Sequence, residues 1–359
     1  MTRCWLRTSR LARRPEAVRI HVTYTGGTIG MIDSPHGLVP GADLEGWLGT
    51  LLGESASGQD LGRKDVTLTA LSPLIDSSNA TPESWQLIID DLRTTAAGPT
   101  PPDAFIVLHG TDTMAYTSAA LSYALTDLSQ PVVITGSQLP LGVVGSDAAP
   151  NVTGALRAAV SGRADGITLF FGHRLLAGNR ATKTSSWAFR GFDSPSVAPL
   201  ALTGAPWQWS EPAAGGRGWD GPARPYARHD VAVIDLVPGV TAARLEAMVT
   251  PQPEAVILRA FGVGNVPSDE PGLTNVVADL IEAGVAVVVT SQCHQAEVLL
   301  GHYETGDAIA RAGAVGSRDM TLEAVYAKVQ FLLSQGLRGA ELAAWVGRSI
   351  AGELTESRG

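Results

Sequence analysis

Cysteine is scarce in this sequence: Cys4 and Cys293 are the only two among 359 residues. One distant pair supplies neither a disulfide framework nor the ligands of a tetrahedral zinc site, so we expect no metal. Long apolar runs are also lacking, and none approaches the ~18 residues of a membrane span. The composition, 45% apolar and 17% charged, excludes a largely disordered chain.

Basic residues are outnumbered, 26 Lys and Arg against 35 Asp and Glu, which gives a net charge of −9. Five Arg and one Glu fall in residues 1–17, and no basic cluster of the kind that binds nucleic acid occurs beyond them. This leader has no apolar run of secretory-signal length, so we expect a disordered segment and a cytoplasmic protein. Lysine occurs only at Lys64, Lys183 and Lys328.

Short apolar runs rich in β-branched residues alternate with helical patterns along the chain. This order predicts an α/β fold, with a larger, doubly wound (flavodoxin-like) N-terminal domain and a smaller C-terminal α/β domain. We expect a leader at 1–17, a catalytic domain at 18–204, a linker without strand or helix periodicity at 205–229 and a second domain at 230–359. The expected strands are 18–24, 104–108, 131–135, 167–171, 231–234, 255–258 and 285–290, and the expected helices are 82–93, 112–128 and 273–283.

The first expected strand runs into Gly26, Gly27 and Thr28. Loops at the carboxyl ends of parallel strands bind ligands, and two glycines allow close backbone approach beside the Thr28 hydroxyl. A dinucleotide-binding loop is the alternative, but the first glycine of G-x-G-x-x-G is missing.

A second polar loop, with His109, Gly110, Thr111 and Asp112, follows the strand at 104–108. Thr111 or Asp112 alone could be a helix N-cap, whereas two threonine-bearing loops on one sheet favour a site. Lys183 lies among threonines beyond a further strand. It is either a base partner in the site or a solvated loop lysine.

Together these motifs resemble the bacterial-type L-asparaginases that use a threonine nucleophile, and further stretches resemble their cytoplasmic, type I branch. These are the segments at 25–30, 109–114 and 182–183, and then those at 73–78, 114–117, 135–138, 178–180 and 311–313. The resemblance implies hydrolysis of L-asparagine to L-aspartate and ammonia without a cofactor. It also implies a homodimer or homotetramer.

The resemblance also assigns roles to individual residues. Thr28 is the implied nucleophile, and Thr111, Asp112 and Lys183 form the implied proton-transferring triad. The implied substrate-binding residues are Gly27, Asp76, Ser77, Ser78 and Gly110, with the two serines on the substrate α-carboxylate and Asp112 also on its α-ammonium. Thr182, Arg259 and Cys293 match a possible allosteric asparagine site; ordinary packing is the alternative, and it is favoured for Cys293.

One position departs from the family pattern. Leu38 stands where the family usually has a tyrosine that helps to activate the nucleophile, and a leucine cannot transfer a proton. His36, Tyr24 or Tyr303 could take over this role. If none does, turnover is slow, and an asparagine-binding sensor with weak or no catalysis becomes the alternative function. A glutaminase or another amidase is the same-class alternative.

Overall fold

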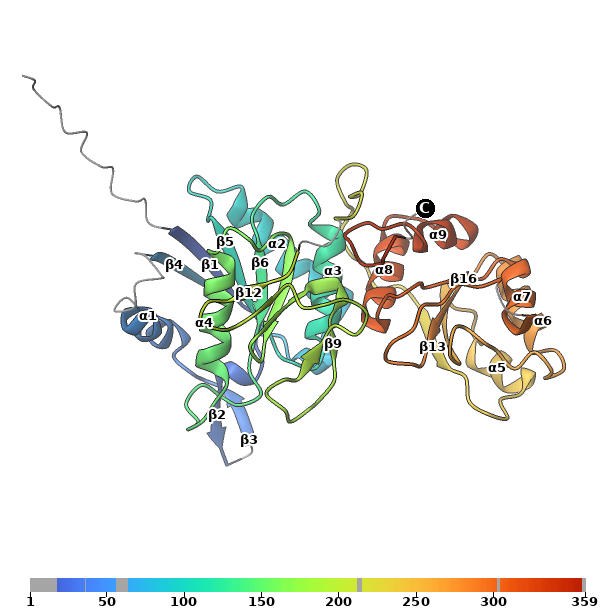
Figure 1. Ribbon diagram of the computed structural model, residues 1–359, viewed down its shortest axis with the longest axis horizontal. Coiled ribbons are helices and arrows are strands. Elements are labelled where there is room, and N and C mark those ends of the chain that lie inside the picture. The colour runs from blue at the N-terminus through green and yellow to red at the C-terminus, as the bar shows by residue number, and fades with distance from the viewer. Residues whose placement is uncertain (1–17, 36, 56–63, 212–214, 302–303, 357–359) are drawn as a thin grey trace, which may run out of the picture.

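The computed structural model describes residues 18–35, 37–55, 64–211, 215–301 and 304–356. Its first sheet has eight strands, five of them parallel (Figure 1). The parallel strands lie in the order β4 (Lys64–Ala70), β1 (Val18–Tyr24), β5 (Ala104–Leu108), β6 (Val132–Thr135) and β7 (Ile167–Phe171). Antiparallel strands β8 (Arg174–Ala177), β11 (Ala201–Leu202) and β12 (Gln208–Trp209) extend the sheet beyond β7.

This strand order confirms the doubly wound, flavodoxin-like prediction. The chain moves outward from β1 to β4 on one side and from β5 to β7 on the other, so the order reverses between β1 and β5. Ligand sites of open α/β sheets lie at this reversal, beyond the carboxyl ends of the strands.

Helices cover both faces of the first sheet. On one face, α1 (Leu44–Ser55) and α4 (Ala148–Ala159) share an apolar core with the strands. On the other face lie α2 (Pro82–Ala96) and α3 (Met114–Ala124). Helix α2 forms where expected: Thr81 and Ser84 make a capping box, and Pro82 stands at its start.

The second sheet is smaller and parallel, which confirms the predicted second α/β unit. Its strands lie in the order β13 (Val231–Asp235), β14 (Ala255–Ala260), β15 (Ala286–Ser291) and β16 (Val315–Gly316). Helices α5 (Ala242–Met248), α6 (Leu273–Glu282) and α7 (Glu304–Ala312) share a core with one face. Helices α8 (Leu322–Ser334) and α9 (Gly339–Val346) cover the other face.

A single apolar core joins the two sheets. Residues of α2 and α3 from the first unit and of α8, α9, β14 and β15 from the second belong to one cluster, and α3 lies beside α8 (Figure 1). Buried Tyr123 of α3 donates a hydrogen bond to the Ala324 carbonyl of α8 at 3.0 Å, and Tyr226 donates to the Ala120 carbonyl at 2.9 Å. Burial of apolar surface contributes ~25 cal/mol of stabilising free energy per Å², so this core is the main source of stability in the contact between the units.

Parts of the expected linker at 205–229 pack with the two folded units. Gln208 and Trp209 form β12 and pair with Ala201 and Leu202, although so short a strand leaves no periodicity in the sequence. Tyr226 is buried in the shared core, and Trp219 packs on Phe331 and Trp345. The domain boundaries at 204 and 230 stay a prediction, and residues 1–17 lie outside the described chain. None of the helices in the described ranges is long and apolar enough to cross a membrane.

A buried ion pair fastens the C-terminal segment to α8. Lys328 is fully buried, and its ammonium donates to the carbonyls of Val346 and Arg348 and to the carboxylate of Glu353, at 2.9, 2.5 and 2.5 Å. The Glu353 carboxylate also accepts the Ile350 and Ala351 N–H groups at 2.9 and 2.7 Å. Burial alone would raise the pKa of Glu353, but the Lys328 charge and these hydrogen bonds lower it.

The glycine loops after β1 and β5 touch at the reversal point. The Thr25 N–H donates to the Leu108 carbonyl at 2.9 Å. Gly27 has φ +93°, and a Cβ placed on it would lie 2.5 Å from Cα and N of Gly110. Only glycine combines this backbone conformation with so close an approach.

Replacing Lys328 by methionine should lower the free energy of unfolding by about 3–5 kcal/mol, because the Glu353 charge would be left buried and unpaired. Urea denaturation measures the change. Lys183→Met is the matched control: its carboxylate partner Asp112 is 61% exposed, so a loss below about 1 kcal/mol is expected. Equal losses in the two variants would contradict this interpretation.

Gly27→Ala should destabilise the protein by at least about 1–3 kcal/mol, since it forces a side chain into a positive-φ conformation and against Gly110. Gly49→Ala is the control, because a Cβ at this position of α1 meets nothing within 4 Å. It should raise stability by about 0.5–1 kcal/mol. Thermal or urea denaturation that ranks the two variants the other way would refute the close-approach argument.

Candidate active site

The two glycine loops place Thr28 and Thr111 next to their point of contact. Gly27 directly precedes Thr28, which begins the short 3-10 helix η1 (Thr28–Gly30), and Gly110 directly precedes Thr111. The Thr28 side chain is partly exposed, whereas Thr111 is buried. The structure thus brings together the two loops that the sequence singles out at the carboxyl ends of β1 and β5.

Lys183 bridges the two polar side chains of the second loop. Its ammonium lies 2.9 Å from the Thr111 hydroxyl and 2.7 Å from the Asp112 carboxylate. The Lys183 side chain is 18% exposed, so it is not the solvated loop lysine of the alternative interpretation. The contacts allow a proton to pass between the lysine and the threonine oxygen, with the carboxylate balancing the lysine charge.

The N-cap interpretation of Thr111 and Asp112 is wrong. Helix α3 begins at Met114, and its N-cap is Thr113, whose side chain makes no cap hydrogen bond. The Thr113 hydroxyl donates instead to the Ser77 carbonyl at 2.7 Å, which fastens the second loop to the segment after β4. Thr111 and Asp112 are therefore left to contact Lys183.

The segment after β4 lies against the second loop and is the third part of the candidate site, after the loops that follow β1 and β5. Asp76 precedes the 3-10 helix η2 (Ser77–Asn79), and its carboxylate accepts the Ser78 N–H and hydroxyl at 3.1 and 2.9 Å. Ser77 is buried against the second loop: a Cβ on Gly110 would lie 2.4 Å from its hydroxyl oxygen. Of the expected substrate-binding residues, Ser77, Gly27 and Gly110 thus share one contact region, while Asp76 shapes the exposed turn that carries Ser78.

Lys183 itself lies on a strand of only two residues. Strand β9 (Thr182–Lys183) pairs only with β10 (Phe192–Asp193), outside the main sheet. Arg174 of β8 holds β10, since it contacts the Asp193 carboxylate at 2.7 Å and donates to the Phe192 carbonyl. The hairpin is thereby tied to the edge of the sheet.

His109 is a buried residue of the second loop to which sequence reasoning assigns no role. Its Nδ1 lies 2.7 Å from the Gly110 carbonyl and its Nε2 lies 3.0 Å from the Thr117 hydroxyl. Burial lowers the pKa of His109, which favours the neutral ring, so Nδ1–H donates to Gly110 and Nε2 accepts from Thr117. The ring fixes the Gly110 peptide beside Thr111; its place in the motif is the only signal that the sequence offers.

The expected replacements for the missing loop tyrosine are not seen to act on Thr28. Leu38 lies on β3 (Gly37–Pro40), which pairs with β2 (Met31–Ser34), and its side chain is outside the description. His36 and Tyr303 also lie outside the described residues. Tyr24 is buried with its hydroxyl against Gly30, and within the described chain this hydroxyl has no hydrogen-bond partner.

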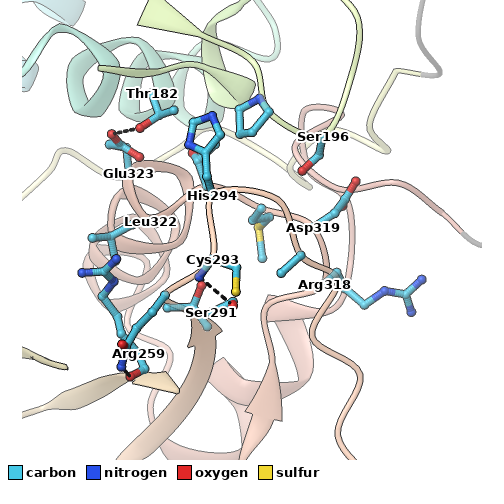
Figure 2. Close-up of a pocket in the computed structure, with 16 residues that line it drawn as sticks. Thr182, Ser196, Arg259, Ser291, Cys293, His294, Arg318, Asp319, Leu322 and Glu323 are labelled. Carbon is cyan, nitrogen blue, oxygen red and sulfur yellow. Dashed lines mark hydrogen bonds between the residues drawn. The ribbon is translucent and has the colours of Figure 1, made fainter. Parts of the chain in front are cut away.

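A polar pocket of about 220 Å³ lies beside the lysine hairpin, between Thr182 and the second sheet. Figure 2 shows Thr182 and Glu323 hydrogen-bonded at one end of it and Cys293 near its middle. Arg259 also lines the pocket and pairs with Asp235 at 2.8 Å. Cys293 is exposed and lines the same pocket, and its role stays a prediction.

Known proteins match the chain along most of its length. Residues 19–214 match the family described as Asparaginase, N-terminal, and residues 230–346 match the one described as Glutaminase/Asparaginase C-terminal domain. L-asparaginase 1 of Escherichia coli (strain K12) is 38% identical over 338 residues, covering 94% of this chain and 98% of the relative. L-asparaginase of Thermococcus kodakarensis is 30% identical, with 95% and 100% covered. The crystal structure of L-asparaginase I from Vibrio cholerae is 35% identical with a TM-score of 0.83, and the match covers 95% of this chain and 100% of that one. The chain, with its two threonine loops and its bridging lysine, belongs to the asparaginase family.

Proposed function

We propose that this protein hydrolyses L-asparagine to L-aspartate and ammonia, with Thr28 as the nucleophile. The observation that carries the proposal is the Lys183 ammonium, which contacts both Thr111 and Asp112 where the strand order reverses and where the Thr28 loop touches the second loop. The names of the similar proteins favour asparagine over another amide.

The chemistry requires two balanced steps. The Thr28 oxygen attacks the side-chain amide carbon, its proton moves to the leaving nitrogen, and ammonia departs as the C–N bond breaks. Water then attacks the β-aspartyl ester, and Thr28 regains its proton. Thr111 and Lys183 move protons along their 2.9 Å contact, and Asp112 holds the lysine in place.

The loop backbones supply the remaining parts of the site. Gly27 and Gly110 have no Cβ to shield their peptides, so N–H groups can face the oxyanion, a contribution whose loss typically costs ~10²–10³ in rate. Ser77 and Ser78, shaped by Asp76, hold the α-carboxylate of the substrate, and Asp112 holds its α-ammonium. A zwitterionic amino acid needs both kinds of partner.

A cytoplasmic location and a homo-oligomeric state belong to the same proposal. Both rest on the resemblance to the type I branch. The acidic net charge, with no basic cluster beyond the leader, argues against nucleic acid as a partner. We therefore propose a role in asparagine catabolism with L-asparagine as the small-molecule partner.

Thr28→Ala should lower kcat for ammonia release from L-asparagine by at least about a thousandfold, because the acyl intermediate cannot form. The control is Thr50→Ala on the exposed surface of α1, which should keep the wild-type rate. Ammonia release from L-asparagine and from L-glutamine is measured over a wide concentration range. Wild-type-like release from Thr28→Ala would refute the nucleophile, and calorimetric binding of L-asparagine without turnover by the unmodified protein would establish a sensor.

We also propose that the pocket beside Thr182 binds a second molecule of asparagine and regulates the site. Its volume of about 220 Å³ suits a small amino acid, Arg259 offers a partner for a carboxylate, and the Glu323 carboxylate offers one for an ammonium. Cys293 also lines the pocket (Figure 2). Thr182 directly precedes Lys183, so a ligand here lies one residue from the triad.

The rate should then depend sigmoidally on L-asparagine concentration, and Arg259→Met should shift the sigmoid at least about tenfold to higher concentration. The matched control is Arg244→Met, an exposed position on α5 away from the pocket, which should leave the curve unchanged. A hyperbolic wild-type curve together with a single calorimetric binding site would remove the regulatory site.

A further inference from the structure

The strand that carries Lys183 is held largely by the C-terminal half of the chain. Just before it, in η3 (Gly178–Arg180), Arg180 pairs with Asp319 at 2.9 Å, with side chains only 6% and 12% exposed. Arg180 also donates to the Gly352 carbonyl at 2.9 Å, and the Asn179 amide donates to the Ala351 carbonyl at 2.8 Å. The backbone that leads to Lys183 in the first unit is therefore held by hydrogen bonds and an ion pair from the C-terminal half of the chain.

Glu323, also from the C-terminal half of the chain, contacts strand β9 itself. It lies in the first turn of α8, is 9% exposed, and accepts the Thr182 hydroxyl at 2.7 Å (Figure 2). The Lys183 backbone N–H lies close enough to this carboxylate to lower its pKa. A single group on α8 thus binds Thr182 and lies beside the backbone of Lys183.

Glu323 makes these contacts from a buried position, where a carboxylate is rarely found without a charged partner. Burial raises its pKa, and hydrogen bonds from Thr182, from the Glu323 and Lys183 N–H groups and from Thr321 oppose this increase. Within the described chain it forms no ion pair. Burial and, after it, the Glu323 charge raise the pKa of Tyr116 to about 12, and Arg259, His294, Arg318 and Asp319 line the same pocket as Glu323. The start of α8 offers it a favourable helix dipole.

Other residues of α8 already hold this helix against α3, so Glu323 is not needed for that contact alone. The shared apolar core and the hydrogen bond from Tyr123 to Ala324, the residue after Glu323, already join α8 to α3. A buried carboxylate adds a desolvation cost that an apolar side chain would not have. What the carboxylate supplies in addition is directional, because one of its oxygens accepts the Thr182 hydroxyl of β9 at 2.7 Å.

We propose that Glu323 is a positioning residue for the reaction, which holds the backbone of Thr182 and Lys183 so that the lysine ammonium bridges Thr111 and Asp112. The inference rests on the proposed function of Lys183 in catalysis. Glu323 acts through the strand and touches neither the substrate molecule in the active site nor the reacting atoms.

Glu323→Ala and Glu323→Gln test the proposal in the full-length protein. Glu323→Ala should lower kcat for L-asparagine by about tenfold to a hundredfold with a smaller change in KM, and Glu323→Gln should retain more activity because its amide oxygen can still accept from Thr182. Tyr123→Phe is the matched control on the same helix contact: it should reduce stability while leaving kcat near the wild-type value.

A second measurement does not depend on turnover. Each folded protein is treated briefly with an amine-acylating ester, and acylation of Lys183 is quantified by mass spectrometry of its peptide; fully buried Lys328 reports unfolding. Glu323→Ala should raise Lys183 acylation several-fold with no change at Lys328. Should this variant fail to fold, Glu323→Gln carries the test with a smaller increase.

The outcomes separate the two proposals. Unchanged kcat or unchanged Lys183 acylation in the glutamate variants would overturn the positioning role, as would a loss of kcat no greater than that of Tyr123→Phe at equal loss of stability. If the wild type shows no asparagine hydrolysis, the proposed function fails, while the acylation experiment still decides whether Glu323 positions the lysine.

Discussion

The contact between α3 and α8 is the constraint on which the rest of the structure depends. Helix α3 follows the loop of Thr111 and Asp112, and α8 begins with the turn that carries Glu323. Because one apolar core contains both helices, the polar groups at their N-terminal ends are held at fixed separation. The hydrophobic packing of α3 on α8 thus sets the distances at which Glu323 binds Thr182 and Lys183 binds Thr111.

The elements and loops that the sequence predicts are those with strong local signals. Runs such as Ala104–Leu108 are buried on both faces, so they read as strands without any alternation. Their carboxyl ends carry the glycine–threonine loops, and the rule for parallel sheets places ligands there. Thr28, Thr111 and Lys183 are therefore predictable as members of one region, and the resemblance adds their separate roles.

What the sequence does not reveal depends on tertiary contacts. Strand β12 is two residues long, too short for a period. Edge strand β4 is absent from the expected strands although its Val66, Leu68 and Ala70 alternate with threonines. Glu323 is one acid among 35 Asp and Glu residues and lies about 140 positions from Lys183. The capping role that was the alternative for Thr111 and Asp112 is a local preference that the Lys183 and Ser77 contacts override.

The C-terminal segment has a consequence for the order in which the protein is made. Ala351 and Gly352 accept hydrogen bonds from Asn179 and Arg180, and Glu353 completes the buried pair with Lys328. During synthesis these residues leave the ribosome long after the loops of Thr28 and Thr111 have emerged. A nascent chain can form the first sheet early, yet the segment that leads to its lysine strand gains the Ala351 and Gly352 hydrogen bonds only once these late residues have emerged.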